Sequence, residues 1–408
     1  MAEGLPITRR LRRARVAVSL IFFVHGAVFA SWAARVPAVK DELHLSEGML
    51  GVVMAGPGLG ALAGSQLGGL MVQRLGSRTV SGLAPVALSL PLGLVPVAQS
   101  AWPLMGVLVL LGAADGCTSV AMNAQAVVVQ REYGRAVLNS MHALRSVGAV
   151  AGGLAGVATV SLGLTLTAQF VLMALLLAVL SAAGAWGLIP EAEPSAKSAA
   201  TEPSPGDGDE RGDRTDAVAL YGSPRGRGRR ATVSLLALMT FLAALVEDTP
   251  ASWSGVYLRE LGADAATAAA GYAAFSAGGV VTRLLNDRLV NRLGWVRLIR
   301  TGTLCCAVVL AVALLLGRPG VALAALVVAG AGISAVFPGA FTAAGALPRP
   351  GLAMGQVGFA GNLGWLLVPP LIGGAATVVG LPLALGLLVV AALAIALLAP
   401  LTRTGGTA

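Results

Sequence analysis

The chain contains twelve apolar stretches, each long enough to cross a lipid bilayer. A helix needs about 20 mainly apolar residues to span the hydrocarbon core. In the first half of the chain such stretches lie at 15–38, 48–73, 78–98, 102–128, 137–161 and 165–188. In the second half they lie at 232–258, 264–290, 298–317, 320–345, 352–378 and 381–401. Because lipid offers no partners for backbone polar groups, this pattern predicts an all-α membrane protein with twelve transmembrane helices.

The composition agrees with a membrane chain and excludes an ordinary soluble fold. Hydrophobic residues make up 56% of the sequence and charged residues 12%, whereas globular domains carry about 25% charged residues. The 54 glycines suit membrane helices, which pack through small residues. Cys117, Cys305 and Cys306 lie in apolar runs without the spacing of a zinc or redox site, so we expect buried thiols.

A short pattern occurs once in each half of the chain. Residues 30–32 (Ala-Ser-Trp) and 73–76 (Gln-Arg-Leu-Gly) return as 251–253 (Ala-Ser-Trp) and 291–294 (Asn-Arg-Leu-Gly). This spacing is far longer than the 20 to 50 residues of a solenoid repeat, so it predicts duplicated domains.

The duplication divides the chain into an N-terminal six-helix half, 1–188, and a C-terminal six-helix half, 232–408. Between them, the polar composition of residues 189–231 predicts a disordered linker.

With this topology, 22 of the 28 Lys and Arg residues lie on the side that holds both termini and the linker. The positive-inside rule therefore places the termini and the linker in the cytoplasm. The arginines before the first span resemble a signal peptide, but that span matches the seventh, so we expect it to be retained.

Ionisable and polar residues within the first-half spans are candidates for function. Placing a charge in a span costs about 2.5–3.5 kcal/mol on insertion scales, so such groups normally face a cavity or a partner. Asp115 and Asn123 share one face of the fourth span, and His142 and Arg145 lie within one turn of the fifth. Arg145 comes within reach of Asp115 if the two helices are antiparallel, which leaves a buried structural ion pair as the alternative.

The seventh span contains the adjacent carboxylates Glu247 and Asp248. Neighbouring helix positions point about 100° apart, so we expect at most one of the two to face a given cavity. Burial and mutual repulsion favour a carboxylate that exchanges a proton near neutral pH, with a structural role for both as the alternative. In the repeat, Glu247 corresponds to Gly26, which places His25 and Glu247 at nearly equal depth. For His25 a core hydrogen bond and a functional role are both open.

Glycines and prolines mark unusual helix surfaces. Glycines at every fourth position lie on one face of the second span, at Gly56, Gly60, Gly64 and Gly68. The fifth span has the same spacing at Gly148, Gly152 and Gly156. These faces predict close helix packing, and it is open whether they also let helices slide between two states. Pro369 and Pro370 are expected to kink or break the eleventh span.

The ends of the spans hold candidate anchors and latches. Trp32 and Trp253 lie near the outer ends of their spans, where tryptophan normally anchors a helix at the membrane interface; gating or ligand stacking is the alternative. Arg283, Asp287 and Arg288 cluster near the cytoplasmic end of the eighth span, and we interpret them as a structural or conformational latch.

The loop after the second span resembles the signature of the major facilitator superfamily. Gly69 is followed by Gln73-Arg74, Gly76 and Arg78 at the spacing of that signature, except that Gln73 replaces an Asp. The resemblance covers nearly the whole chain and implies two pseudo-symmetric six-helix halves. It also implies a charge latch at this loop, which Gln73 weakens.

Other segments resemble a bacterial permease branch of the superfamily that is distantly similar to fucose:proton symporters. These segments are residues 121–125 followed by His142, and residues 253–258. Where the symporters carry acids on their first and fourth helices, this chain has His25 and Asp115. The helix-five motif of drug/proton antiporters matches only in part, because Gly153 stands at the expected proline, which argues against efflux by antiport.

We therefore expect a secondary active transporter that moves a small polar or amphipathic solute across the bacterial inner membrane by alternating access, coupled to protons. Drug or metabolite efflux by proton antiport and a non-transporting sensor or scaffold are the alternatives. Predicted solute-binding or proton-coupling residues are His25, Asp115, Asn123, His142, Arg145, Glu247, Asp248 and Asn362. Predicted gating or latch residues are Trp32, Arg74, Arg78, Trp253, Arg283, Asp287 and Arg288.

Several activities are not expected. The sequence has no HExxH or GxSxG motif and no nucleotide-binding glycine loop, so we expect neither enzyme activity nor a cofactor or metal, and a proton gradient in place of ATP. The expected partners are the lipid bilayer and a small-molecule substrate, without nucleic acid, and the chain is expected to act as a monomer.

Overall fold

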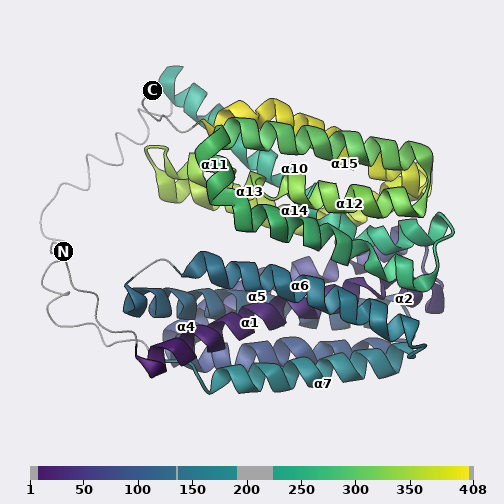
Figure 1. The fold of residues 1–408 in the computed structure, drawn as a ribbon, viewed down its shortest axis with the longest axis horizontal. Helices are drawn as coiled ribbons and strands as arrows, with labels where there is room; N and C mark the ends of the chain where they lie inside the picture. The colour runs from purple at the N-terminus through teal and green to yellow at the C-terminus, as the bar shows by residue number, and fades with distance from the viewer. Residues whose placement is uncertain (1–7, 135–136, 191–223, 404–408) are drawn as a thin grey trace, which may run out of the picture.

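The computed structural model describes residues 8–134, 137–190 and 224–403. In these ranges the regular structure is helical throughout, and the helices form two bundles that lie side by side (Figure 1). Most of the predicted linker, residues 191–223, lies outside the described residues. The helix after it begins at Pro224, ahead of the predicted start at 232.

The elements of the two halves follow one another in the chain. The first half contains α1 (Arg9–Ala33), α2 (Val36–Glu42), α3 (Glu47–Val53), α4 (Gly56–Ser89), η1 (Leu90–Val97), α5 (Ala101–Tyr133), α6 (Leu138–Ser161) and α7 (Leu166–Ala185). The second half contains α10 (Pro224–Glu260), α11 (Ala265–Leu316), α12 (Pro319–Ile333), α13 (Val336–Gly345), α14 (Pro350–Val379), α15 (Leu381–Leu398) and η2 (Ala399–Thr402).

Two long helices each contain two membrane spans. In the described residues, ten helical segments are long and apolar enough to cross a membrane. One of these runs through α4, which turns at Gly76, and α11 turns in the same way at Gly294. Counting both arms of α4 and both arms of α11 gives the twelve predicted spans within the described ranges.

The repeated sequence pattern corresponds to a repeated backbone turn. Gly76 has φ 79° and ψ 151°, and Gly294 has φ 73° and ψ 159°. An L side chain rarely adopts this backbone conformation, so glycine is required at both sharp turns. The pattern therefore marks the place where each half folds one span back against the next.

The repeat also extends to the outer ends of the helices. His44 (φ 49°) and Gly262 (φ 82°) both have a left-handed backbone just before the next helix. Ser46 then caps α3 by accepting from the backbone N–H of Met49, and Asp264 caps α11 in the same way. Such caps satisfy the unpaired N–H groups of a helix start.

The glycine faces bring helices of the same half into backbone contact. A Cβ atom on Gly60 or Gly64 of α4 would overlap the carbonyl oxygens of Val109 or Ala113 in α5. In α6, a Cβ atom on Gly148 would overlap the Phe23 carbonyl oxygen of α1, and Gly152 is similarly close to α1. The predicted close packing is confirmed, and it lies within the N-terminal half.

The prediction that Trp32 and Trp253 anchor the span ends at the membrane interface was wrong. Trp32 and Trp253 are fully buried, and Trp32 stacks on Phe170 with ring centroids 6.1 Å apart. A tryptophan must reach the lipid headgroups to act as an interfacial anchor, so neither residue can do so. Helix α14 continues through Pro369 and Pro370 to Val379, so the proline pair does not break the helix.

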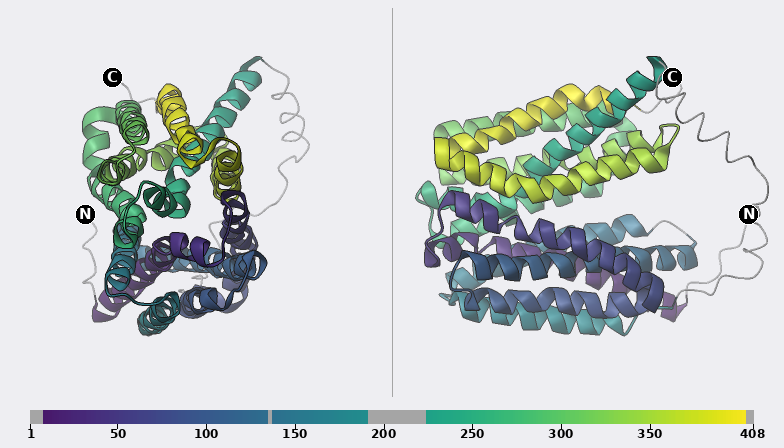
Figure 2. Two further views of the ribbon diagram at one scale, coloured as in Figure 1. Left: turned by 90° about the vertical axis from the view of Figure 1, so that its right-hand side faces the viewer. Right: turned by 180° about the vertical axis from the view of Figure 1, so that it is seen from behind.

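The two halves meet at the end of the molecule opposite the termini (Figures 1 and 2). A Cβ atom on Gly51 of α3 would lie 2.6 Å from the Pro369 carbonyl oxygen of α14, and one on Gly373 would lie 2.6 Å from the Glu47 carbonyl oxygen. Nearby, a Cβ atom on Gly153 of α6 would lie 2.7 Å from the Ala273 Cβ of α11. These close contacts join the two halves at this end.

Candidate functional site: the central cavity

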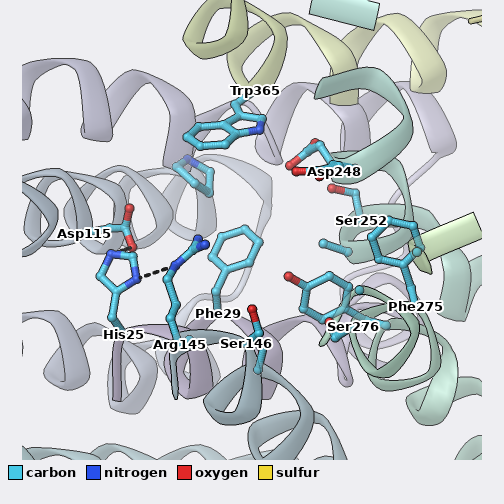
Figure 3. Close-up of a pocket in the computed structure, with 18 of the residues that line it drawn as sticks. His25, Phe29, Asp115, Arg145, Ser146, Asp248, Ser252, Phe275, Ser276 and Trp365 are labelled. Carbon is cyan, nitrogen blue, oxygen red and sulfur yellow. Dashed lines mark hydrogen bonds and ion pairs between the residues drawn. The ribbon is translucent and has the colours of Figure 1, made fainter. Parts of the chain in front are cut away.

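A cavity of about 170 Å³ lies between the two halves. Its lining comes from α1, α4, α5 and α6 of the first half and from α10, α11, α12 and α14 of the second (Figure 3). The charged and histidine residues in this lining are His25, Asp115, Arg145, Glu247, Asp248 and Arg283. The structure thus brings together five of the eight predicted solute or proton residues, together with Arg283 from the predicted latch.

On the first-half side, His25 lies between Arg145 and Asp115. Arg145 Nε donates a hydrogen bond to His25 Nδ1 over 3.2 Å, and His25 Nε2 lies 3.0 Å from Asp115 Oδ1. The contact with Asp115 is an ion-pair distance but is out of line for a straight hydrogen bond. Since Nδ1 accepts, this arrangement requires a neutral imidazole with its proton on Nε2, facing the carboxylate. The predicted pairing of Arg145 with Asp115 therefore runs through His25.

The residue next to His25 explains how α1 and α6 come so close. Gly26 faces α6, and a Cβ atom there would overlap the carbonyl oxygen of Arg145. Only glycine allows the two backbones to touch at this level, because any side chain would separate them. The close approach places His25 of α1 and Arg145 of α6 within hydrogen-bond distance.

On the second-half side, Arg283 of α11 links the two halves across the cavity. Its Nη2 lies 3.4 Å from Glu247 Oε1 of α10, and its Nη1 donates to Ser146 Oγ of α6 over 3.1 Å. Ser146 directly follows Arg145 in the sequence. One guanidinium group thus joins a carboxylate of its own half to a hydroxyl group of the other half.

Asp248 also lines the cavity, close to Ser252 and Trp365 in Figure 3. Its Oδ2 atom is buried and has no hydrogen-bond partner among the residues that the structure describes. The prediction that at most one of Glu247 and Asp248 would face a given cavity was wrong. The lining continues from α11, past α10, to α14. Side chains that point about 100° apart from α10 can therefore both reach this cavity.

Aromatic and hydroxyl side chains complete the lining. Phe29, Tyr272, Phe275 and Trp365 provide ring surfaces, and Ser146, Ser252, Ser276 and Ser334 provide hydroxyl groups. The sequence analysis did not select these residues, because serine and phenylalanine are common in membrane helices. Trp365 carried a usable signal, since it lies in the middle of a span and not at an end.

Three predicted residues lie outside the lining of this cavity. Asn123 donates from its side-chain amide to the Ser119 carbonyl oxygen of its own helix over 2.8 Å. His142 is exposed and packs edge-on against Phe22, with ring centroids 4.8 Å apart. Asn362 is also exposed and does not line the cavity, although it lies one turn from Trp365 on α14.

The other predicted gating and latch residues lie away from the cavity as well. Arg74, Arg78 and Arg288 are exposed. Trp32 and Trp253 are fully buried and do not contribute to the lining. The side chain of Asp287 lies outside the described residues, so its predicted interaction with Arg283 stays a prediction.

Two helical halves that meet around a polar cavity define a membrane transporter. A family model described as Major Facilitator Superfamily matches residues 17–369, and the chain belongs to this superfamily. The resemblance seen in the sequence is therefore confirmed at the level of the superfamily.

Known relatives include bacterial transporters without an assigned substrate. The chain is 32% identical over 376 residues to an uncharacterized MFS-type transporter of Yersinia pestis, covering 91% of each protein. It is 29% identical over 340 residues to an uncharacterized transporter of Sinorhizobium fredii, covering 83% of this chain and 84% of the relative.

Solved structures show the same fold at low sequence identity. The nucleoside transporter NupG matches with a TM-score of 0.71 and 13% identity, over 95% of this chain and 98% of its own. A D-xylose-proton symporter matches with a TM-score of 0.72 and 15% identity, over 94% of this chain and 97% of its own.

Proposed function

We propose that this transporter carries a small polar solute through the central cavity by alternating access, driven by a proton gradient. The observation that carries the proposal is the guanidinium group of Arg283, which joins Glu247 to Ser146 of the opposite half. A bond between the halves that depends on a carboxylate in the cavity can couple the charge of that carboxylate to the separation of the halves.

Proton binding would act on both sides of the cavity. Protonation of Glu247 removes the charge that holds Arg283 and frees the guanidinium group to move with α11. Protonation of His25 at Nδ1 removes the acceptor for Arg145 Nε, so that hydrogen bond must break. Each event changes the contacts of an arginine that lies at the boundary between the halves.

The size of the cavity supports a small solute. Its volume of about 170 Å³ is below the roughly 300–1,000 Å³ of pockets that bind drug-sized molecules. The four aromatic rings and four serine hydroxyls of the lining suit a solute with both polar and apolar surfaces. This favours transport of a small metabolite over efflux of bulky drugs.

The orientation follows from the distribution of charge. The exposed arginines at the start of α1 and after the turn in α4 lie at the end of the molecule that holds the termini. In a bacterial inner membrane the positive-inside rule places this end in the cytoplasm. The halves are in contact at the opposite end, so we interpret the structure as closed to the outside.

The experiment is uptake by purified protein in liposomes under an imposed pH gradient, with solutes first selected by their effect on thermal unfolding. We expect uptake that follows the gradient and stops when a protonophore collapses it. Uptake that ignores the gradient, and is unchanged in Glu247→Gln, Asp248→Asn and Asp115→Asn, would exclude proton coupling.

A further inference from the structure

The charged groups that line the cavity do not balance. Among the described lining residues, two guanidinium groups face three carboxylates, while the hydrogen bond from Arg145 requires His25 to be neutral. Arg283 lies 3.4 Å from Glu247, and Arg145 is connected to Asp115 through His25. Both arginines are thus already engaged, which leaves the carboxylate of Asp248 without a cation.

The surroundings of Asp248 make this imbalance significant. Its Oδ2 atom is buried and accepts no hydrogen bond from the described residues, although Ser252 lies nearby in Figure 3. A buried carboxylate without a donor is unfavourable unless a proton or a positive ligand group supplies one. Asp248 also lines the cavity, so a solute bound there would lie beside this carboxylate.

Aromatic rings lie around the same space. Trp365 of α14 and Tyr272 and Phe275 of α11 line the cavity together with Asp248. In the view of Figure 3 the indole ring of Trp365 lies on the same side of the cavity as Asp248. The faces of aromatic rings attract cations, most strongly when the groups are removed from water. A cavity lined by a carboxylate, a tryptophan and a tyrosine is a suitable environment for an ammonium group.

We propose that the cavity binds a small organic cation, a protonated amine or a quaternary ammonium compound, whose positive charge pairs with Asp248 beside Trp365. The proposal rests on the proposed function, because it names the solute class of the same cavity. The volume of about 170 Å³ restricts the cation to a compact molecule. A neutral solute would leave Asp248 unpaired or would require a proton on it.

The test compares cations with neutral molecules of the same shape. Thermal unfolding of the purified full-length protein at pH 8 is measured with choline against 3,3-dimethylbutan-1-ol, and with N-methylglucamine against sorbitol. A ligand that binds the folded protein raises its Tm by mass action. We expect at least one cation to raise the Tm more than its neutral partner does, and to bind at least tenfold more tightly by calorimetry.

Variants connect this preference to one carboxylate. Asp248→Asn is expected to abolish the preference for the cation, and Asp248→Glu is expected to retain it. Asp264→Asn is the matched control: it replaces an exposed carboxylate outside the cavity, and asparagine still caps α11. The comparison within the wild-type protein remains decisive even if Asp248→Asn does not fold.

The proposal is overturned if neither cation exceeds its neutral partner, or if the preference survives in Asp248→Asn. Its failure is separate from that of the proposed function. Gradient-driven uptake of a neutral solute would reject the cation and keep the transporter mechanism. Cation binding without any gradient-driven uptake would keep the cation site and reject the proton-driven transport mechanism.

Discussion

At the scale of single residues, the account depends on where His25 lies. The sequence identified His25, Asp115 and Arg145 as candidates, but it treated the histidine and the Asp–Arg pair as separate questions. The structure places the imidazole ring between the other two groups. This order depends on the contact of Gly26 with the Arg145 backbone, which is a matter of helix spacing that one sequence does not specify.

Replacing His25 with phenylalanine keeps a ring but removes both nitrogens. The change leaves Arg145 and Asp115 without their shared partner, and an intramolecular hydrogen bond contributes about 0.5–1.5 kcal/mol net. We therefore expect a loss of stability of this size in unfolding measurements, together with loss of solute uptake. His142→Phe is the control, because His142 is exposed and its ring contact with Phe22 survives the change. Equal effects of the two substitutions would contradict the role given to His25.

The cap of α11 gives a prediction about pH. The backbone N–H and the hydroxyl group of Thr267 donate to the Asp264 carboxylate and lower its pKa below the ordinary value of 3.8. Because the folded state has the lower pKa, this contribution to stability is present at neutral pH and is lost as the pH falls through the folded value. Asp264→Ala should lower the Tm at pH 7, and the difference from wild type should shrink below about pH 4. A constant difference across this range would argue against the carboxylate as the cap.

At the scale of helices, the glycine spacing in the sequence predicted the packing well. The apolar stretches and the repeat predicted the position of each of the twelve spans. The two turns at Gly76 and Gly294 fall within the repeated motif. The positions of Trp32 and Trp253 were not predictable in this way. A tryptophan near a span end can face lipid or its own bundle, and the choice depends on neighbours such as Phe170 that are distant in sequence.

Gly64→Ala tests the contact between α4 and α5. The added methyl group would overlap the Ala113 carbonyl oxygen, and overpacking of a well-packed interface costs about 1–3 kcal/mol. Gly69→Ala, on the same helix, is the matched control, because a Cβ atom there meets nothing within 4 Å. We expect a lower unfolding temperature for Gly64→Ala alone. Equal destabilisation of Gly69→Ala would contradict the packing account, because alanine has the higher helix propensity and its Cβ atom meets no neighbour at this position.

At the scale of the whole molecule, the structure is one of two states that alternating access requires. Its closed end depends on α3 and α14 touching at Gly51 and Gly373. The sequence identified the duplication and the superfamily but not this contact. The two glycines that form it belong to no regular spacing, and they are recognisable only once the halves are placed together.

Gly373→Val should therefore shift the protein away from the observed state. Spin labels at Asp41 and Ala265 are expected to show a longer distance across the closed end than in the wild type, in a background without native cysteines. Gly374→Val is the control, because a Cβ atom at Gly374 meets nothing within 4 Å. An unchanged distance distribution in Gly373→Val would show that this contact does not hold the halves together.

The most direct test of the central claim compares net uptake with exchange in Glu247→Gln. Exchange of solute across a liposome membrane needs the halves to alternate while loaded, whereas net uptake driven by a pH gradient also needs the proton to be carried. If Arg283 couples Glu247 to the opposite half, Glu247→Gln should retain solute exchange and lose uptake driven by the gradient. Full gradient-driven uptake in this variant would contradict the account.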